Sequence, residues 1–166
     1  MGWGTGEGPV SDQVDVESRL RELGIELPEP PAPVGAYVAV RRSGRLLFLS
    51  GQIPLADGKP RFLGKVGVEL SVDEGKAAAR LCAINSLAQI RKALGGWAGF
   101  GGLVRLSGYV AGAEDFTGQA RVMDGASDLF AEVLGGRGAH ARLAMGVSAL
   151  PLGVPVEIEV IAEAAG

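Results

Sequence analysis

The feature that most limits the possible folds is one long helical segment that carries both a start and a stop signal. Ser71 and Glu74 form a capping box, in which the two side chains satisfy backbone N–H groups at a helix start. Apolar residues then recur with helical spacing to about Leu94, and Gly95 and Gly96 end the pattern. A helix with such a broad apolar face must cover another element, and a sheet is the natural partner.

The rest of the chain alternates between strand-like and helix-like segments. Further helices are predicted over 14–23 and 115–134, and strands over 37–40, 46–50, 103–111, 141–147 and 156–162. The first two strands are predicted to form a hairpin about Ser43 and Gly44, and 55–70 is predicted to be a loop with a turn at Asp57 and Gly58. This order favours an α+β fold, with a mixed β-sheet and two long helices packed on one face.

Length and composition narrow the function classes. The 166 residues suit one domain over 13–166, after a Gly-rich segment over 1–12 that we expect to be a flexible tail. The net charge of −3, without a basic stripe, does not favour nucleic-acid binding. Cys82 and His140 are the single cysteine and histidine, so neither a disulfide nor a common zinc site is expected. With no signal-peptide pattern and no membrane-spanning run, we expect a soluble cytoplasmic protein.

Charged residues inside the last two apolar strands are the strongest indication of chemistry. Arg142 lies in the first of these strands, and Glu157 and Glu159 lie in the second. We predict that the two strands pair as an antiparallel hairpin, which would place Arg142 on the same face as the glutamates if the loop has an even number of residues. An exposed cross-strand ion pair is one interpretation. The other is a guanidinium that anchors an acidic small molecule beside a glutamate that holds a water.

Two further places could contribute to a site. Ser50 and Gly51 follow a predicted strand, where a glycine lets a ligand approach the backbone, although a plain turn explains the pattern as well. No G-x-S-x-G elbow is present, so a serine hydrolase is not expected. His140 precedes Arg142 by two residues and could act as a base, but a structural role is favoured. Cys82 lies in an Ala- and Leu-rich helix and is interpreted as a packed side chain.

Three sequence motifs together resemble the RidA/YjgF family, also labelled endoribonuclease L-PSP. They are A-P-V-G-A-Y at 32–37, L-S-G-Q-I-P at 49–54, and the run from Arg142 through L-P at 150–151 to E-I-E at 157–159. The resemblance covers about 33–164. It implies a chorismate-mutase-like fold, a homotrimer with ligand clefts between subunits, and no cofactor or metal. For active members it implies hydrolysis of 2-imino or 2-aminoacrylate-type acids to 2-oxo acids and ammonia.

The resemblance also implies roles for individual residues. Arg142 matches the arginine that holds the substrate carboxylate, and Glu157 matches the glutamate that orients the attacking water. Tyr37 matches a pocket tyrosine and Ser50 a pocket serine, with Gly51 beside it. We therefore expect these five residues to bind or convert a small carboxylate-bearing metabolite.

The chain departs from the family pattern in three respects. Asp124 stands where the family has an asparagine, and Ala144 stands where a cysteine is frequent. The predicted N-terminal helix and the proline segment after it resemble a longer branch of the family. We expect Asp124 to lie at the substrate site, where its carboxylate could repel an acidic ligand.

Three functions follow from these observations. The first is a trimeric enamine/imine deaminase that uses Arg142 as anchor and Glu157 for water and protons. The second is a non-catalytic sensor or chaperone-like protein that binds a small carboxylate or a protein partner. The third is an endoribonuclease or translation inhibitor, which the acidic net charge and the absence of a histidine pair disfavour.

Overall fold

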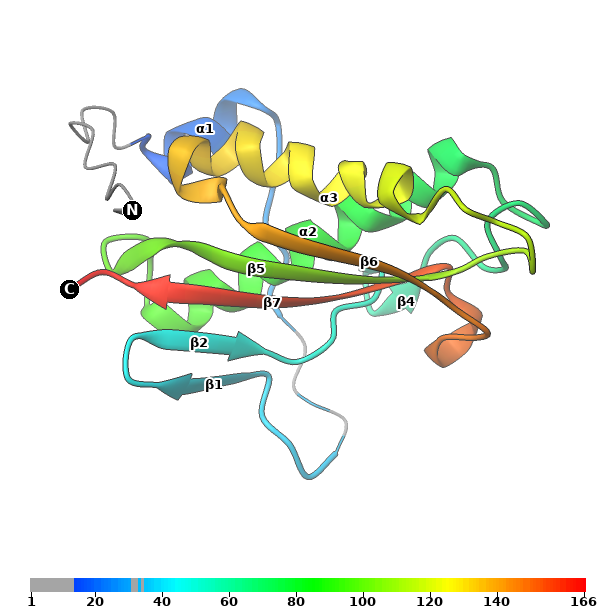
Figure 1. The fold of residues 1–166 in the computed structure, drawn as a ribbon. Helices are drawn as coiled ribbons and strands as arrows, with labels where there is room; N and C mark the ends of the chain where they lie inside the picture. The colour runs from blue at the N-terminus through cyan, green and yellow to red at the C-terminus, as the bar shows by residue number, and fades with distance from the viewer. Residues whose placement is uncertain (1–13, 31–32, 34) are drawn as a thin grey trace, which may run out of the picture.

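The computed structural model describes residues 14–30, 33 and 35–166, so the predicted tail over 1–12 lies outside the described residues. Figure 1 shows the chain as a sheet with helices along one side. The elements in chain order are α1 (Val16–Glu22), β1 (Val40–Ser43), β2 (Leu46–Leu49), β3 (Leu55–Ala56), β4 (Lys59–Pro60), α2 (Val72–Leu94), β5 (Phe100–Ala111), α3 (Gln119–Leu134), the 3₁₀ turn η1 (Gly135–Gly138), β6 (Ala141–Val147), the 3₁₀ turn η2 (Pro151–Gly153) and β7 (Val156–Ala164).

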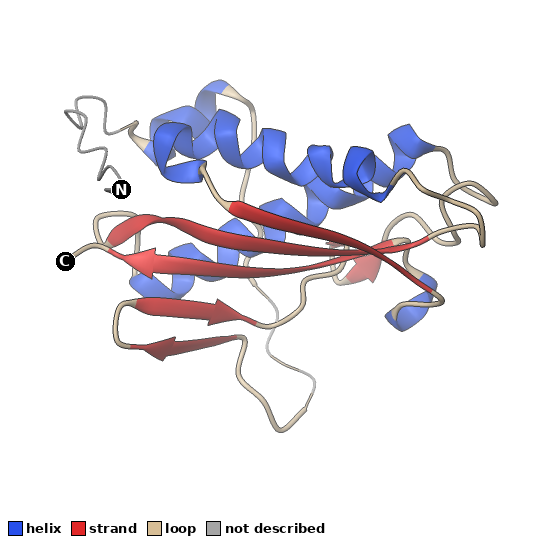
Figure 2. Ribbon diagram, in the orientation of Figure 1, coloured by secondary structure: helices blue, strands red, loops and turns tan. Residues whose placement is uncertain are grey.

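Five strands form one mixed sheet in the order β1-β2-β7-β5-β6. The β1, β2, β7 and β5 neighbours are antiparallel, whereas β6 runs parallel to β5. The helices lie together on one side of this sheet, as Figure 2 shows. The predicted α+β class, with two long helices on one face of a mixed sheet, is therefore confirmed.

The core lies between the helices and the sheet face that they cover. Along β7 the side chains of Val156, Ile158 and Val160 are fully buried, whereas those of Glu157 and Glu159 point to the other, open face. This alternation divides the strand into a buried apolar face and an open, charged face. The buried side of α2 and α3 supplies the opposing layer, including Leu87 and Phe130.

The predicted limits of α2 are confirmed in detail. The Ser71 hydroxyl accepts a hydrogen bond from the Glu74 backbone N–H at 3.2 Å, and the Glu74 carboxylate accepts one from the Ser71 backbone N–H at 2.7 Å. Gly95 ends the helix at a φ of 66°, in the left-handed region that favours glycine. Each end of the helix is thus fixed by residues identifiable in the sequence.

Several other predicted limits were wrong by a few residues. The first strand begins at Val40, so Tyr37 precedes it. Helix α3 begins at Gln119 and not at 115, because Phe116 closes a turn onto the carbonyl of Ala113. Strand β5 begins at Phe100, three residues before the predicted start, where a bulge lets glycines enter the strand.

The predicted hairpin between the last two strands was wrong. Strand β5 lies between β6 and β7 and pairs with both of them. The sequence 100–147 is a strand–helix–strand crossover, with α3 connecting β5 to its parallel neighbour β6. This topology decides on which side of the sheet Arg142 lies.

Candidate functional site

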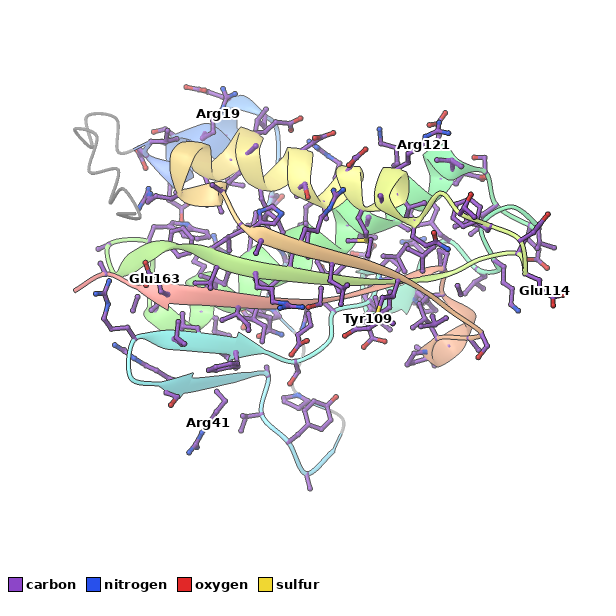
Figure 3. The ribbon with its side chains drawn as sticks, in the orientation of Figure 1. Arg19, Arg41, Tyr109, Glu114, Arg121 and Glu163 are labelled. Atoms are coloured by element: carbon purple, nitrogen blue, oxygen red, sulfur yellow. The ribbon has the colours of Figure 1, made fainter. Side chains whose placement is uncertain are left out.

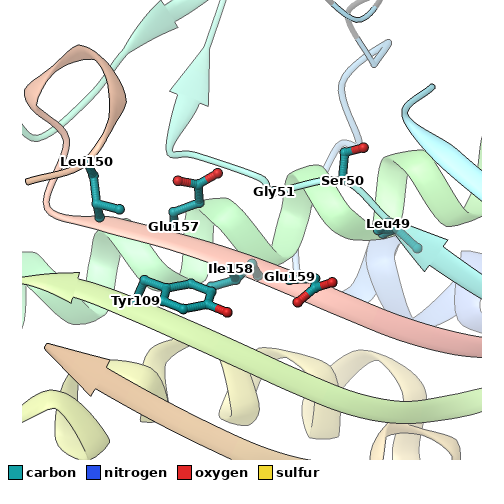
Figure 4. Close-up of a pocket in the computed structure, with 8 residues that line it drawn as sticks. All are labelled: Leu49, Ser50, Gly51, Tyr109, Leu150, Glu157, Ile158 and Glu159. Carbon is teal, nitrogen blue, oxygen red and sulfur yellow. The ribbon is translucent and has the colours of Figure 1, made fainter. Parts of the chain in front are cut away.

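A surface pocket opens beside the first half of β7 (Figure 4). Three of the predicted site residues, Ser50, Gly51 and Glu157, line it. The other lining residues are Leu49, Tyr109, Leu150, Ile158 and Glu159. We call Ser50, Gly51 and Glu157 the carboxylate pocket.

Backbone pairing and a missing side chain bring these three residues together. Gln52 exchanges two backbone hydrogen bonds with Ile158, at 2.8 and 3.0 Å, which ties the segment after β2 to β7. A Cβ on Gly51 would overlap the Glu157 carboxylate in its present position, so glycine lets this carboxylate lie directly against the backbone. The Ser50 hydroxyl donates to the carbonyl of Val38 at 2.7 Å and thereby holds the chain that precedes β1.

Sequence reasoning did not identify one residue that supports the pocket. Asn85 is a buried polar residue of α2, and its amide donates to the carbonyls of Ile53 and Leu55 at 3.0 and 3.1 Å. These bonds fix the loop that follows the carboxylate pocket. An asparagine within the apolar face of a long helix was the signal in the sequence.

Glu157 is the electrostatically unusual member of the pocket. Its side chain is half-buried, and this burial raises the pKa of the carboxyl from its usual 4.5. Burial is the sole cause of this shift, and the described residues place no ion-pair or hydrogen-bond partner at its carboxylate. A carboxyl with a raised pKa keeps its proton to a higher pH than an exposed one does.

Cys82 belongs to α2 and lies below Glu157 of β7. It is fully buried, as predicted for a packed side chain. Its burial, followed by the charge of Glu157, raises the pKa of the thiol. The thiolate is the reactive form of cysteine, so a raised pKa argues against a nucleophilic role for Cys82.

We predict that Glu157→Gln stabilises the fold at pH 8 and not at pH 4. The folded-state pKa of Glu157 is raised, so ionisation costs stability once the pH passes that pKa, while below the unfolded value near 4.5 the carboxyl is protonated in both states. Glutamine removes that cost without changing the shape of the side chain. Thermal unfolding across this pH range measures the effect, with Glu159→Gln, at an exposed position of the same strand, as the control. Equal gains at both pH values would contradict the interpretation.

Arg142 lies on the opposite side of the sheet from Glu157. Leu106 of β5 pairs with Arg142 on one side and with Val160 on the other, and Leu106 and Val160 are buried against the helices. The prediction that Arg142 shares a face with the glutamates was therefore wrong, because β5 separates the two strands. The predicted site residues therefore fall into two sets, which lie on opposite faces of the same sheet.

The Arg142 side chain is held by α3. Its Nη1 donates to the Asp124 carboxylate at 2.9 Å and to the Ser127 hydroxyl at 3.2 Å. The side chain remains 28% exposed, and within the described part of the chain its Nε and Nη2 make no hydrogen bond. We call Asp124, Ser127, His140 and Arg142 the guanidinium cluster.

The placement of the predicted residues is thus divided. Glu157, Ser50 and Gly51 lie together in the carboxylate pocket, and Arg142 and Asp124 lie together in the guanidinium cluster. Tyr37 belongs to neither, because it lies before β1 and is 57% exposed. Ser127 was not identified from the sequence, although its position one helical turn after Asp124 was the available signal.

The described residues offer neither a metal-binding cluster nor a membrane-spanning helix. No group of three or more His, Cys, Asp or Glu side chains in them is arranged to hold a metal ion. No helix in the same residues is both long and apolar enough to cross a bilayer.

Comparison with known proteins finds close relatives over most of the chain. The profile of the family described as "YjgF/chorismate mutase-like, putative endoribonuclease" matches residues 17–164. The protein TCP17 of Trypanosoma cruzi is 42% identical over 149 residues, which cover 89% of this chain and 93% of that protein.

Two solved structures illustrate different degrees of similarity to this chain. Atu1372 from Agrobacterium tumefaciens, a protein of unknown function, is 42% identical with a TM-score of 0.85, over 90% of this chain and 92% of its own. Escherichia coli TdcF, crystallised with bound serine, is 26% identical with a TM-score of 0.60, over 82% of this chain and 94% of its own.

Proposed function

Because the chain belongs to the YjgF/chorismate mutase-like family, we propose that it hydrolyses reactive 2-imino and enamine acids to 2-oxo acids and ammonia. The observation that carries this proposal is Glu157, a half-buried carboxyl with a raised pKa and an unpaired carboxylate among the described residues, in a pocket that also holds Ser50 and Gly51. The bound serine in the TdcF crystal supports a small amino-acid-like ligand for this family.

The proposed site needs two copies of the chain. The carboxylate pocket and the guanidinium cluster lie on opposite faces of one sheet, so a single chain cannot place both against one small molecule. We propose a homotrimer, in which Arg142 of one subunit faces Glu157 of the next. Phe48 and Met145 support a subunit contact at the open face, because these apolar side chains are 37% and 46% exposed there.

The proposed chemistry needs no strong nucleophile, because the imine carbon of the substrate is already electrophilic. Arg142 binds the substrate carboxylate and orients the imine. Glu157 accepts a proton from the attacking water, and the resulting hydroxyl adds to the carbon of the protonated imine to give a tetrahedral amino alcohol. Glu157 then returns this proton to the nitrogen, and as the C–N bond breaks Glu157 takes up the hydroxyl proton, which gives a 2-oxo acid and ammonia. A raised pKa suits both halves of this exchange.

A specific contact favours a second candidate, a sensor that binds a small carboxylate without converting it. Asp124 lies 2.9 Å from Arg142 and offsets part of its charge, which weakens the electrostatic help that the arginine could give to a reaction. The same pair still permits recognition of a carboxylate. This candidate predicts binding of 2-oxo acids with no release of ammonia.

RNA cleavage has less support. Charged side chains of both signs lie on separate elements, such as Arg19 on α1, Arg41 on β1 and Glu163 on β7 (Figure 3), whereas a phosphate backbone calls for a concentrated positive surface. RNA cleavage that copurifies with the protein and persists at high salt would restore this candidate.

Complementation between two inactive variants tests the shared site. We expect Arg142→Ala and Glu157→Gln each to lose ammonia release from 2-imino acids generated in situ by an amino acid oxidase. Mixed trimers, made by co-expressing the two variants with different tags and purified through both tags, should recover about a third of the wild-type sites, because one of the three clefts in each mixed trimer combines an intact Arg142 with an intact Glu157.

The controls separate the candidates. Doubly tagged trimers of Arg142→Ala alone must stay inactive. Mixed trimers that remain inactive, while wild-type trimers are active, would contradict a site shared between subunits. Wild-type trimers that bind 2-oxobutyrate but never release ammonia would identify the sensor.

A further inference from the structure

His140 is fixed in one tautomer by its surroundings. Its Nδ1 lies 2.6 Å from the carbonyl oxygen of Gly138, which can only accept, so Nδ1 carries a hydrogen. The ring also packs edge-to-face against Phe130, with the ring centroids 5.9 Å apart. In the neutral ring Nε2 is therefore left as an acceptor of fixed direction.

This acceptor determines where the Ser127 hydroxyl points. The Ser127 Oγ lies 3.0 Å from His140 Nε2 and donates its hydrogen there. Its oxygen lone pairs then remain to accept from Arg142 Nη1 at 3.2 Å. The hydrogen bonds thus run in one direction, from Arg142 to Ser127 to His140.

These hydrogen bonds determine which edge of the Arg142 guanidinium stays open. Nη1 has two N–H bonds, and Asp124 and Ser127 accept one each. The Nε and Nη2 hydrogens lie side by side on the remaining edge, which matches the two oxygens of a planar carboxylate.

We infer that Ser127 and His140 are positioning residues that hold Arg142 with its Nε–Nη2 edge free to grip a carboxylate through two parallel hydrogen bonds. This inference rests on the proposed function, in which Arg142 anchors the ligand. It assigns His140 a task through Ser127, without contact with the ligand.

The first test compares Ser127→Ala with Ser127→Thr, using 2-oxobutyrate binding to the full-length protein measured by calorimetry at pH 8. Alanine removes the acceptor for Nη1, so we expect about fivefold weaker binding, whereas threonine keeps the hydroxyl and should bind within about twofold of wild type. His140→Phe keeps the ring packing but frees the hydroxyl, and we expect about threefold weaker binding. The amide oxygen of the glutamine in His140→Gln can accept a hydrogen bond from Ser127, so this variant should recover part of the lost affinity.

Two readouts distinguish positioning from a general structural effect. In the deaminase assay Ser127→Ala should raise KM and leave kcat nearly unchanged, because the lost contact serves substrate and transition state alike. In an Arg142→Lys background, where the ammonium has no Nη1 to be held, Ser127→Ala should weaken binding by less than about twofold.

The outcomes are separable from those of the proposed function. If Arg142→Ala weakens 2-oxobutyrate binding strongly while Ser127→Ala binds like wild type, the positioning inference fails, but the proposal that Arg142 binds the ligand carboxylate remains. An equal effect of Ser127→Ala in the wild-type and Arg142→Lys backgrounds would also overturn it. If wild-type protein binds no 2-oxobutyrate, both the anchor and the inference fail.

Discussion

Arg142→Ala is expected to lower kcat/KM for 2-imino acids by about 30-fold to 4,000-fold while the protein stays folded. Removing one partner of a charged, hydrogen-bonded contact with a ligand costs about 2–5 kcal/mol, and each 1.4 kcal/mol is a factor of ten. The side chain is partly exposed and belongs to an edge strand, so its loss leaves the core unchanged. Ammonia release and the unfolding temperature together measure the two effects.

The matched control for this variant is Arg121→Ala. Arg121 lies on α3, the same helix that holds Arg142, but its exposed side chain projects away from the sheet (Figure 3). It removes the same charge from the protein without touching the guanidinium cluster. Wild-type ammonia release by Arg142→Ala would refute the anchor, and equal losses in both variants would point to net charge instead.

Gly125→Ala is expected to cost about 3 kcal/mol of unfolding free energy, the largest stability effect that we predict. Gly125 lies where α3 crosses α2, and a Cβ there would overlap the Lys76 carbonyl and lie 2.9 Å from the Lys76 Cα. Alanine gains about 1 kcal/mol of helix propensity over glycine, but the obstacle is backbone, which cannot rotate away. The two helices would have to separate.

Denaturant unfolding at a fixed protein concentration measures this effect, because subunit association adds its own stability. Gly136→Ala is the control, since nothing lies within 4 Å of a Cβ at that position. We expect it to change the unfolding free energy by less than about 0.5 kcal/mol. A Gly125→Ala protein as stable as this control would show that the helix crossing is looser than described.

The parts of the fold set by local signals could be predicted from the sequence. The capping box at Ser71 and the glycine at Gly95 defined α2, and alternation defined the two faces of β7. Strand pairing was not predictable in the same way, because it depends on contacts between distant segments. Two strands joined by a short connection suggested a hairpin. No residue near these strands in the sequence indicated that β5 would lie between them.

The candidate site shows the same division. Ser50, Gly51 and Glu157, which the family resemblance assigned to one site, lie together in the carboxylate pocket. Arg142 was placed on the wrong face, because its orientation follows from the parallel β5–β6 pairing. Ser127 and Asn85 were missed, because one hydroxyl or amide on a helix has no meaning until its partner is known.

The crossover from β5 through α3 to β6 has an evolutionary consequence. It gathers Asp124, Ser127, His140 and Arg142 into one short, continuous stretch of chain, whereas the carboxylate pocket joins the loop after β2 to the last strand. If the proposed function holds, substitutions in that stretch would retune which acids this chain recognises while the groups proposed to act on water stay untouched. Specificity and reactivity would then be free to diverge separately.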